Sequence, residues 1–199
     1  FNDAVRANVG RRHTTEQTIA AYNLARKVGF ENINMDFIAG LNGDTLDSFK
    51  NSIDTAVDMG ADSVTVHNLA LKSGAYLVTE KEYFDLSQRN TAYNMIDYSA
   101  QKLSHSGYYP YYMYRQSKSL GNLENVGWCK SNKDCLYNVF MMDETHTVLA
   151  AGAGAVTKLK NPQTSHIERI YNFKYPYEYI NDFQVLIDRK SQIVDFYNK

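Results

Sequence analysis

The chain has few cysteines and no long apolar run, and each shortage excludes a class of protein. Its two cysteines, Cys129 and Cys135, cannot make the framework of disulfides that holds small secreted domains together. No apolar stretch approaches the roughly 18 residues of a membrane-spanning helix, and no signal peptide is visible. We therefore expect a cytoplasmic protein with no membrane segment.

Excess charge and metal-ligand clusters are also missing. A net charge of -1 over 199 residues gives no electrostatic case for a nucleic-acid or membrane surface. The five histidines show no metal-ligand spacing. A hydrophobic content of 44% is ordinary for a globular protein, and the length suffices for one large domain or two small ones.

Tyrosine, in contrast, is abundant, with sixteen copies beside a single tryptophan. Aromatic residues of this density suit strands, because their rings pack well on a pleated surface. They could also line a pocket for a flat ligand, although plain packing is the commoner role. The tyrosines gather in two groups, one at positions 108, 109, 111, 112 and 114 and the other at 171, 175, 177 and 179.

The first third of the chain alternates between helix and strand patterns. Thr14 and Gln17 form a capping box for a helix that ends at Gly29. Strands over 33–38 and 62–69 are separated by a helix that begins at Thr45. This alternation predicts a parallel sheet with right-handed crossovers. Before it, Asn2 can cap a short helix that no strand precedes, so we expect the chain to begin inside a repeating βα architecture.

The strand at 33–38 has an unusual polar face. Ile33, Met35 and Phe37 alternate with Asn34 and Asp36, although a strand inside an α/β domain is normally apolar throughout. A buried carboxylate is costly without a partner or a ligand, and active sites of α/β barrels lie at the carboxyl ends of strands. The pattern predicts that Asp36 belongs to a ligand site.

The next strand repeats this arrangement. Val64 and Val66 alternate with Ser63, Thr65 and His67. Two neighbouring strands with a polar inner face predict a curved, partly open barrel with a polar interior. His67 would face that interior, where it could contact a cofactor or substrate or be an ordinary core histidine.

After Leu69 the pattern changes, and a loop with Lys72, Ser73 and Gly74 leads into a charged stretch. A long helix is expected over 87–106, and shorter helices over 178–189 and 191–197 close the chain. Short strands are expected at 108–115, 136–142, 147–151, 155–159 and 167–172. These elements predict barrel repeats over 1–75, a connecting loop and long helix over 76–107, and a smaller α+β domain over 108–199.

Several strings in fixed order resemble one known family. They are FND at 1–3, GRRHT at 10–14, NINMDFIAGLNGDT at 32–45 and ADSVTVHNLAL at 61–71. Together they resemble radical S-adenosylmethionine (radical SAM) enzymes of the oxygen-independent coproporphyrinogen III oxidase type. The family string D-L-I-x-G-L-P-G-x-T is matched by DFIAGLNGDT, with Asn42 in place of proline. YRQ at 114–116, GNLENVGW at 121–128 and the small residues at 150–156 resemble the C-terminal domain of one branch.

The resemblance implies a fold and a cofactor site. The fold would be the last βα repeats of a partial, open TIM-like barrel, followed by a small α+β domain. Arg11 would face the methionine carboxylate of S-adenosylmethionine, and Asp36 would accept hydrogen bonds from its ribose hydroxyls. The backbone near Ala70 would contact adenine, and Gly40 would belong to the same site. The plain alternatives are a solvated arginine at position 11 and a structural hydrogen bond at Asp36.

The family also needs a 4Fe–4S cluster held by a C-x3-C-x2-C loop, which this sequence lacks. Two thiolates cannot supply the three ligands of such a loop. The resemblance therefore implies that the chain is the C-terminal half of an enzyme. We expect it to be inactive alone, with both cofactors bound in the intact protein.

The implied reaction is oxidative decarboxylation of two propionates of coproporphyrinogen III, a tetrapyrrole, to vinyl groups in haem biosynthesis. Two alternatives remain open: a haem-binding or haem-delivery relative, and a radical enzyme with another substrate. Cations that could meet propionates are Arg115, Lys118, Lys130, Lys158 and Lys160. We also expect self-association of the chain through an unpaired edge of the strand at 33–38.

Overall fold

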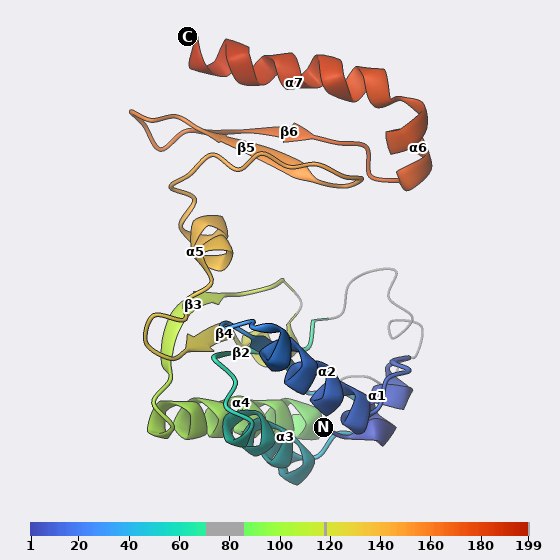
Figure 1. Ribbon diagram of the computed structural model, residues 1–199, viewed down its shortest axis with the longest axis vertical. Coiled ribbons are helices and arrows are strands. Elements are labelled where there is room, and N and C mark those ends of the chain that lie inside the picture. Colours follow the sequence, from blue (N-terminus) through green and yellow to red (C-terminus); the bar gives the residue numbers. More distant parts are fainter. Residues whose placement is uncertain (71–85, 118, 199) are drawn as a thin grey trace. The chain divides into compact units, whose positions relative to one another are not determined.

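The computed structural model describes residues 1–70, 86–117 and 119–198 (Figure 1). Two compact units are present, Phe1–Cys135 and Leu136–Lys199. The connecting loop expected before the long helix, over 76–85, and the candidate cation Lys118 lie outside the described residues. No helix within the described part of the chain is long and apolar enough to cross a membrane.

The first unit opens with two capped helices. Asn2 accepts a hydrogen bond from the Val5 amide at the start of α1 (Asp3–Asn8). At α2 (Thr15–Val28), the Thr14 hydroxyl accepts from the Gln17 amide, and the Gln17 side chain accepts from the Thr14 amide. Gly29 ends α2 in the left-handed conformation. The predicted caps are thus confirmed.

A four-stranded sheet with the order β1-β2-β4-β3 follows. As predicted, β1 (Asn34–Ala39) and β2 (Ser63–Asn68) are parallel. However, β4 (Asn125–Cys129), a strand that the sequence pattern did not predict, lies antiparallel between β2 and β3 (Tyr109–Tyr114). The sheet is therefore mixed.

Two helices cover one face of this sheet. Both α3 (Leu46–Asp58) and α4 (Leu86–His105) contribute to the core, and they pack against each other (Figure 1). The short η2 (Leu120–Asn122) also packs against α4. The fully or almost fully buried core side chains include Phe49, Ile53, Val64, Val66, Met95 and Leu103. Burial of the odd-numbered residues of β1 against this core explains its alternating pattern, because Met35 and Phe37 pack there.

The opposite face carries the polar residues. Asp36 lies opposite Thr65 in the β1–β2 register, and Thr65 lies opposite Gly127 of β4. Gly127 in turn lies opposite Tyr112 of β3. One row of facing positions thus crosses all four strands, with polar side chains on β1, β2 and β3 and a glycine on β4. The predicted polar face of β1 and β2 is confirmed.

The boundary expected at residue 108 differs from the observed division. Both β3 and β4 pair into the sheet that contains β1 and β2, so the first unit continues to Cys135. The sequence pattern places the tyrosine-rich segment in a separate domain, because strand pairing over this distance leaves no local signal.

The second unit contains a two-stranded antiparallel sheet and three helices within the described residues. The strands β5 (Val156–Lys160) and β6 (Ile167–Tyr171) were predicted within a residue or so. The helices are α5 (Leu136–Asp143), α6 (Pro176–Asn181) and α7 (Phe183–Tyr197). The last two occupy the region of the helices expected over 178–189 and 191–197, but the break between them lies at Asp182 and not at residue 190, so the expected boundary is wrong. α7 contacts β6.

Two of the strand predictions in this unit are wrong. Residues 136–142 form α5, because a short apolar run fits a helix as well as a strand when its length alone must decide. Residues 147–151 form no strand, and only Val148 makes an isolated bridge, with Lys158. That segment offers too few consecutive pairing partners for a ladder.

Candidate functional site

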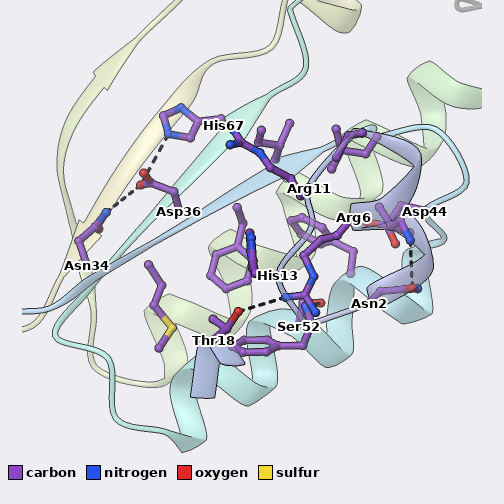
Figure 2. Close-up of a pocket in the computed structure, with 18 residues that line it drawn as sticks. Asn2, Arg6, Arg11, His13, Thr18, Asn34, Asp36, Asp44, Ser52 and His67 are labelled. Atoms are coloured by element: carbon purple, nitrogen blue, oxygen red, sulfur yellow. Dashed lines mark hydrogen bonds and ion pairs between the residues drawn. The ribbon is translucent and has the colours of Figure 1, made fainter. Parts of the chain in front are cut away.

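A cavity of about 570 Å³ lies beside β1 in the first unit (Figure 2). Its walls come from α1, the segment between α1 and α2, both faces of β1, and α3. Asp36 and Arg11, the two charged residues predicted to bind a cofactor, both line it, and so does His67. Three separate motifs supply Arg11, Asp36 and His67. The structure therefore brings to one cavity residues that lie up to 56 positions apart in the sequence.

Asp36 is the best-defined acceptor of the cavity. Its Oδ1 accepts a 2.7 Å hydrogen bond from Asn34 Nδ2 and lies 3.7 Å from His67 Nε2. These two contacts, His67 first, hold the pKa of the Asp36 carboxyl below its usual value although partial burial acts to raise it. The side chain is 63% exposed, so the charged carboxylate is available to a ligand.

Arg11 and His13 come from the segment that joins α1 to α2, and Figure 2 shows both at this cavity. Both are exposed, and Arg11 forms no ion pair with any described residue. A guanidinium with no acidic partner can bind a carboxylate in a two-pronged geometry. The Arg6 guanidinium differs, since it already donates hydrogen bonds to Asp3, Thr15 and Thr18.

Gly40 and Ala70 lie outside the residues that line the cavity. Gly40 has a φ of 86° and donates its amide to Met95 Sδ at 3.4 Å. A Cβ there would lie 2.8 Å from Leu120 Cδ2, so this glycine permits close packing with η2. Ala70 makes an isolated bridge with Ser119 just beyond β2. Their predicted cofactor contacts stay predictions.

Two tyrosines that the sequence did not single out belong to the polar face. Tyr114 OH lies 3.2 Å from His67 Nδ1, and Tyr112 OH lies 3.3 Å from Thr65 Oγ1. Their rings are nearly parallel, 7° apart, with centroids separated by 6.3 Å. Alternation within YYPYYMY was the available signal, but only the position of β4 shows which alternate residues face Asp36.

Most of the basic residues considered for propionates already have partners. Arg115 pairs with Glu124 at 2.8 Å, and Lys158 pairs with Glu144 at 2.7 Å. Lys130 lies over the ring of Tyr108. The tetrapyrrole contacts of these residues stay predictions.

The two cofactors of the resembled family fit this chain differently. A carboxylate acceptor and an unpaired guanidinium on one cavity match the ribose and carboxylate of S-adenosylmethionine. For a cluster, the described residues contain no group of three or more suitable side chains. The free Cys129 is buried, and Cys135 is half-buried. The residues present thus fit S-adenosylmethionine and do not fit the cluster.

Known proteins are similar to this chain over nearly its whole length. The oxygen-independent coproporphyrinogen-III oxidase-like protein HemZ of Bacillus subtilis is 34% identical over 194 residues, which cover 98% of this chain and 38% of HemZ. The heme chaperone HemW of the same organism is 25% identical over 185 residues, 89% of this chain and 46% of HemW. No family model matches.

A solved structure has the same fold. The chain matches coproporphyrinogen III oxidase (HemN) of Escherichia coli, described as a radical SAM enzyme, with a TM-score of 0.62 and 18% identity. The match covers 91% of this chain and 41% of HemN. The chain thus spans about two fifths of the length of the relatives it matches.

The fold is that of the last βα repeats of a partial, open radical SAM barrel, followed by a small second unit. The chain belongs to the oxygen-independent coproporphyrinogen III oxidase type of radical SAM proteins, and it corresponds to part of such a protein.

Proposed function

We propose that this chain supplies the part of a radical SAM protein that holds S-adenosylmethionine and that the whole protein acts on a tetrapyrrole in haem biosynthesis. The observation that carries the proposal is the cavity beside β1, which Asp36 and Arg11 both line. Asp36 would accept from the ribose hydroxyls, and Arg11 would bind the methionine carboxylate. When bound elsewhere in the whole protein, a 4Fe–4S cluster would supply the electron that cleaves the cofactor.

The leading substrate is coproporphyrinogen III, whose propionates would be decarboxylated to vinyl groups. Similarity to HemZ and to an oxygen-independent coproporphyrinogen III oxidase of Pseudomonas aeruginosa supports this choice. Charged Asp36 suits the binding role, since a carboxylate with a low pKa accepts hydrogen bonds throughout the neutral range. We expect this protein to work in the cytoplasm.

The test is S-adenosylmethionine binding by a protein that contains this chain and a C-x3-C-x2-C loop. Asp36→Ala should weaken binding by about 1.5–3 kcal/mol, the range for hydrogen bonds to a charged group. Asp44→Ala is the matched control, because Asp44 is an acidic residue on the same cavity. Unchanged affinity in Asp36→Ala with the fold intact, measured by calorimetry, would remove Asp36 from the site.

A haem-delivery relative is the second candidate, and the similarity to several HemW chaperones favours it. The discriminating measurement uses the same loaded protein. Formation of vinyl products from coproporphyrinogen III, detected by mass spectrometry, supports the oxidase. Stable haem binding and transfer to an apo-haemoprotein without such products supports delivery. S-adenosylmethionine cleavage with neither result would indicate a radical enzyme with another substrate.

A further inference from the structure

Two chains of polar contacts converge on one oxygen of Asp36, and both begin on β3. In the first, Tyr114 OH lies 3.2 Å from His67 Nδ1, and His67 Nε2 lies 3.7 Å from Asp36 Oδ1. In the tautomer that carries its proton on Nε2, the His67 ring accepts from Tyr114 at Nδ1 and turns its own N–H toward the carboxylate. The ring thereby connects β3 to β1 across the sheet.

The second chain reaches the same atom from the other side. Thr65 Oγ1 donates to Asn34 Oδ1 at 3.2 Å, and Asn34 Nδ2 donates to Asp36 Oδ1 at 2.7 Å. The single hydroxyl proton of Thr65 is then used, so Tyr112 must be the donor in its 3.3 Å contact with Thr65. Every bond in this chain points toward the carboxylate, and bonds aligned in this way polarise one another.

The other carboxylate oxygen is left for a ligand. Asp36 Oδ2 accepts no hydrogen bond from the residues described by the structure, while Oδ1 is contacted twice. We propose that Tyr112 and Tyr114 are positioning residues that act through Thr65–Asn34 and through His67 to fix Oδ1, so that Oδ2 faces the bound ligand. The inference rests on the proposed function and names residues that its motifs do not include.

The tyrosines suit this role at any neutral pH. Burial, with the Asp36 charge nearby, raises the pKa of both phenols, so they remain protonated donors. The other titratable or charged groups that face Asp36 or line its cavity are His67 from β2, Arg6 from α1, Arg11 and His13 from the segment after α1, Asp44 from the turn before α3, and the amino terminus at Phe1. Gly127 makes room for the arrangement, since the Tyr112 ring lies where its Cβ would be.

The first test is the pKa of Asp36 in the 199-residue chain, followed by carboxyl carbon NMR. Tyr114→Phe and Tyr112→Phe keep each ring and remove only the hydroxyl, and each should raise the pKa of Asp36. Tyr109→Phe is the matched control, since its hydroxyl on the same strand donates to Asp134 instead. The proposal is overturned if the pKa of Asp36 is unchanged in both variants or moves equally in the control.

Double variants separate the two chains. In a Thr65→Val background, Tyr112→Phe should have no further effect on the pKa, because both lie on one chain. In a Tyr114→Phe background, Tyr112→Phe should add its full effect, because the chains are separate. Equal coupling in both pairs would contradict the assignment of two separate chains. If a tyrosine variant does not fold, Thr65→Val alone tests the second chain and should raise the pKa of Asp36.

S-adenosylmethionine affinity then links the pKa to function. In the protein that carries a cluster loop, each Tyr→Phe variant should weaken binding about two- to tenfold, the effect of one neutral hydrogen bond. Shifted pKa values with no S-adenosylmethionine binding by the unsubstituted protein would sink the proposed function and keep the hydrogen-bond chains. Asp36-dependent binding without any shift in the pKa of Asp36 would overturn the positioning role of the tyrosines and keep the proposed function.

Discussion

At the scale of single residues, Gly127 shows how one missing side chain organises a site. A Cβ at this position would lie 1.9 Å from Tyr112 Cε1, a distance no real contact allows. The φ of Gly127 is not positive, so the backbone itself would accept alanine. The glycine is therefore needed for the ring that crosses it.

Gly127→Ala should displace the Tyr112 ring and lower the free energy of unfolding by about 1–3 kcal/mol, the usual cost of overpacking. Urea denaturation of the chain measures this loss. In a Tyr112→Ala background the same substitution should cost almost nothing, since the clashing ring is gone. An equal cost in both backgrounds would show that Gly127 serves some other purpose.

The sequence allowed prediction of Asp36 on β1 but not of the tyrosines on β3 that belong to the same polar face. Asp36 was predicted because Asn34 and Asp36 give the strand a polar face where a strand of an α/β domain is normally apolar, which is a local signal. Tyr112 and Tyr114 could not be assigned, because their proximity to Asp36 depends on β4 lying between β2 and β3. Non-local pairing of this kind is set by the tertiary fold.

At the scale of elements, a polar cluster of Asp54, Tyr98 and Lys102, the polar clasp, joins α3 to α4. Asp54 of α3 accepts from Tyr98 OH at 2.8 Å and lies 3.0 Å from Lys102 Nζ, both on α4. Burial acts to raise the pKa of Asp54, but these partners outweigh it and lower the pKa. The folded state thus favours charged Asp54.

This clasp predicts an acid-sensitive part of the stability. A lowered folded-state pKa stabilises the protein above the unfolded value of about 4, and the contribution is lost as pH falls through the folded pKa. Asp54→Asn should therefore destabilise the chain near neutral pH and flatten its loss of stability below about pH 4. Thermal unfolding at several pH values measures both effects, with the exposed Asp97→Asn as control. Parallel pH curves for Asp54→Asn and the unsubstituted chain would contradict the assignment.

The start of α2 gives a second prediction at this scale. Thr14→Ala removes a side chain that accepts from the Gln17 amide, and should cost about 0.5–2 kcal/mol of unfolding free energy. Urea denaturation would detect it. Thr14→Ser keeps the acceptor and should restore most of the loss. A serine variant as unstable as the alanine variant would assign the effect to the lost methyl group.

Elements with strong local signals were predicted well, and those without them were not. The caps of α2 and the alternation of β1 and β2 gave correct elements. The pattern of β4 contains Val126 and Trp128, which favour a strand, but Gly127 between them and the polar start weaken the signal. The α5 segment shows the opposite problem, since its apolar run fits two structures equally.

At the scale of the molecule, β1 lies at one edge of the described four-stranded sheet. An unpaired strand edge can pair with another copy of the chain, and Ile38 on this strand is 40% exposed. We expect the 199-residue chain to self-associate through β1, with a mass that grows with concentration in light scattering. A monomer at high concentration, with slow amide exchange throughout Asn34–Ala39, would show this prediction to be wrong.

Ile38→Lys should suppress this association, because a charged side chain on an edge strand disfavours pairing with a copy of itself. Ile180→Lys is the control, since Ile180 is also exposed but lies on α6 in the second unit. Equal suppression by both variants would indicate a general charge effect.

The position of β4 also has a consequence for the order of folding. β4 separates β2 from β3 in the sheet, although it follows both in the chain. During synthesis, β1 and β2 can pair early, while β3 has no partner in this sheet until residues up to Cys129 have left the ribosome. Pairings between residues far apart in sequence slow folding and leave edges exposed for longer. We therefore expect the hydroxyls of Tyr112 and Tyr114 to reach Thr65 and His67 only after β4 has paired. A chain stalled before β4 would carry the motifs of the proposed cofactor site without its geometry.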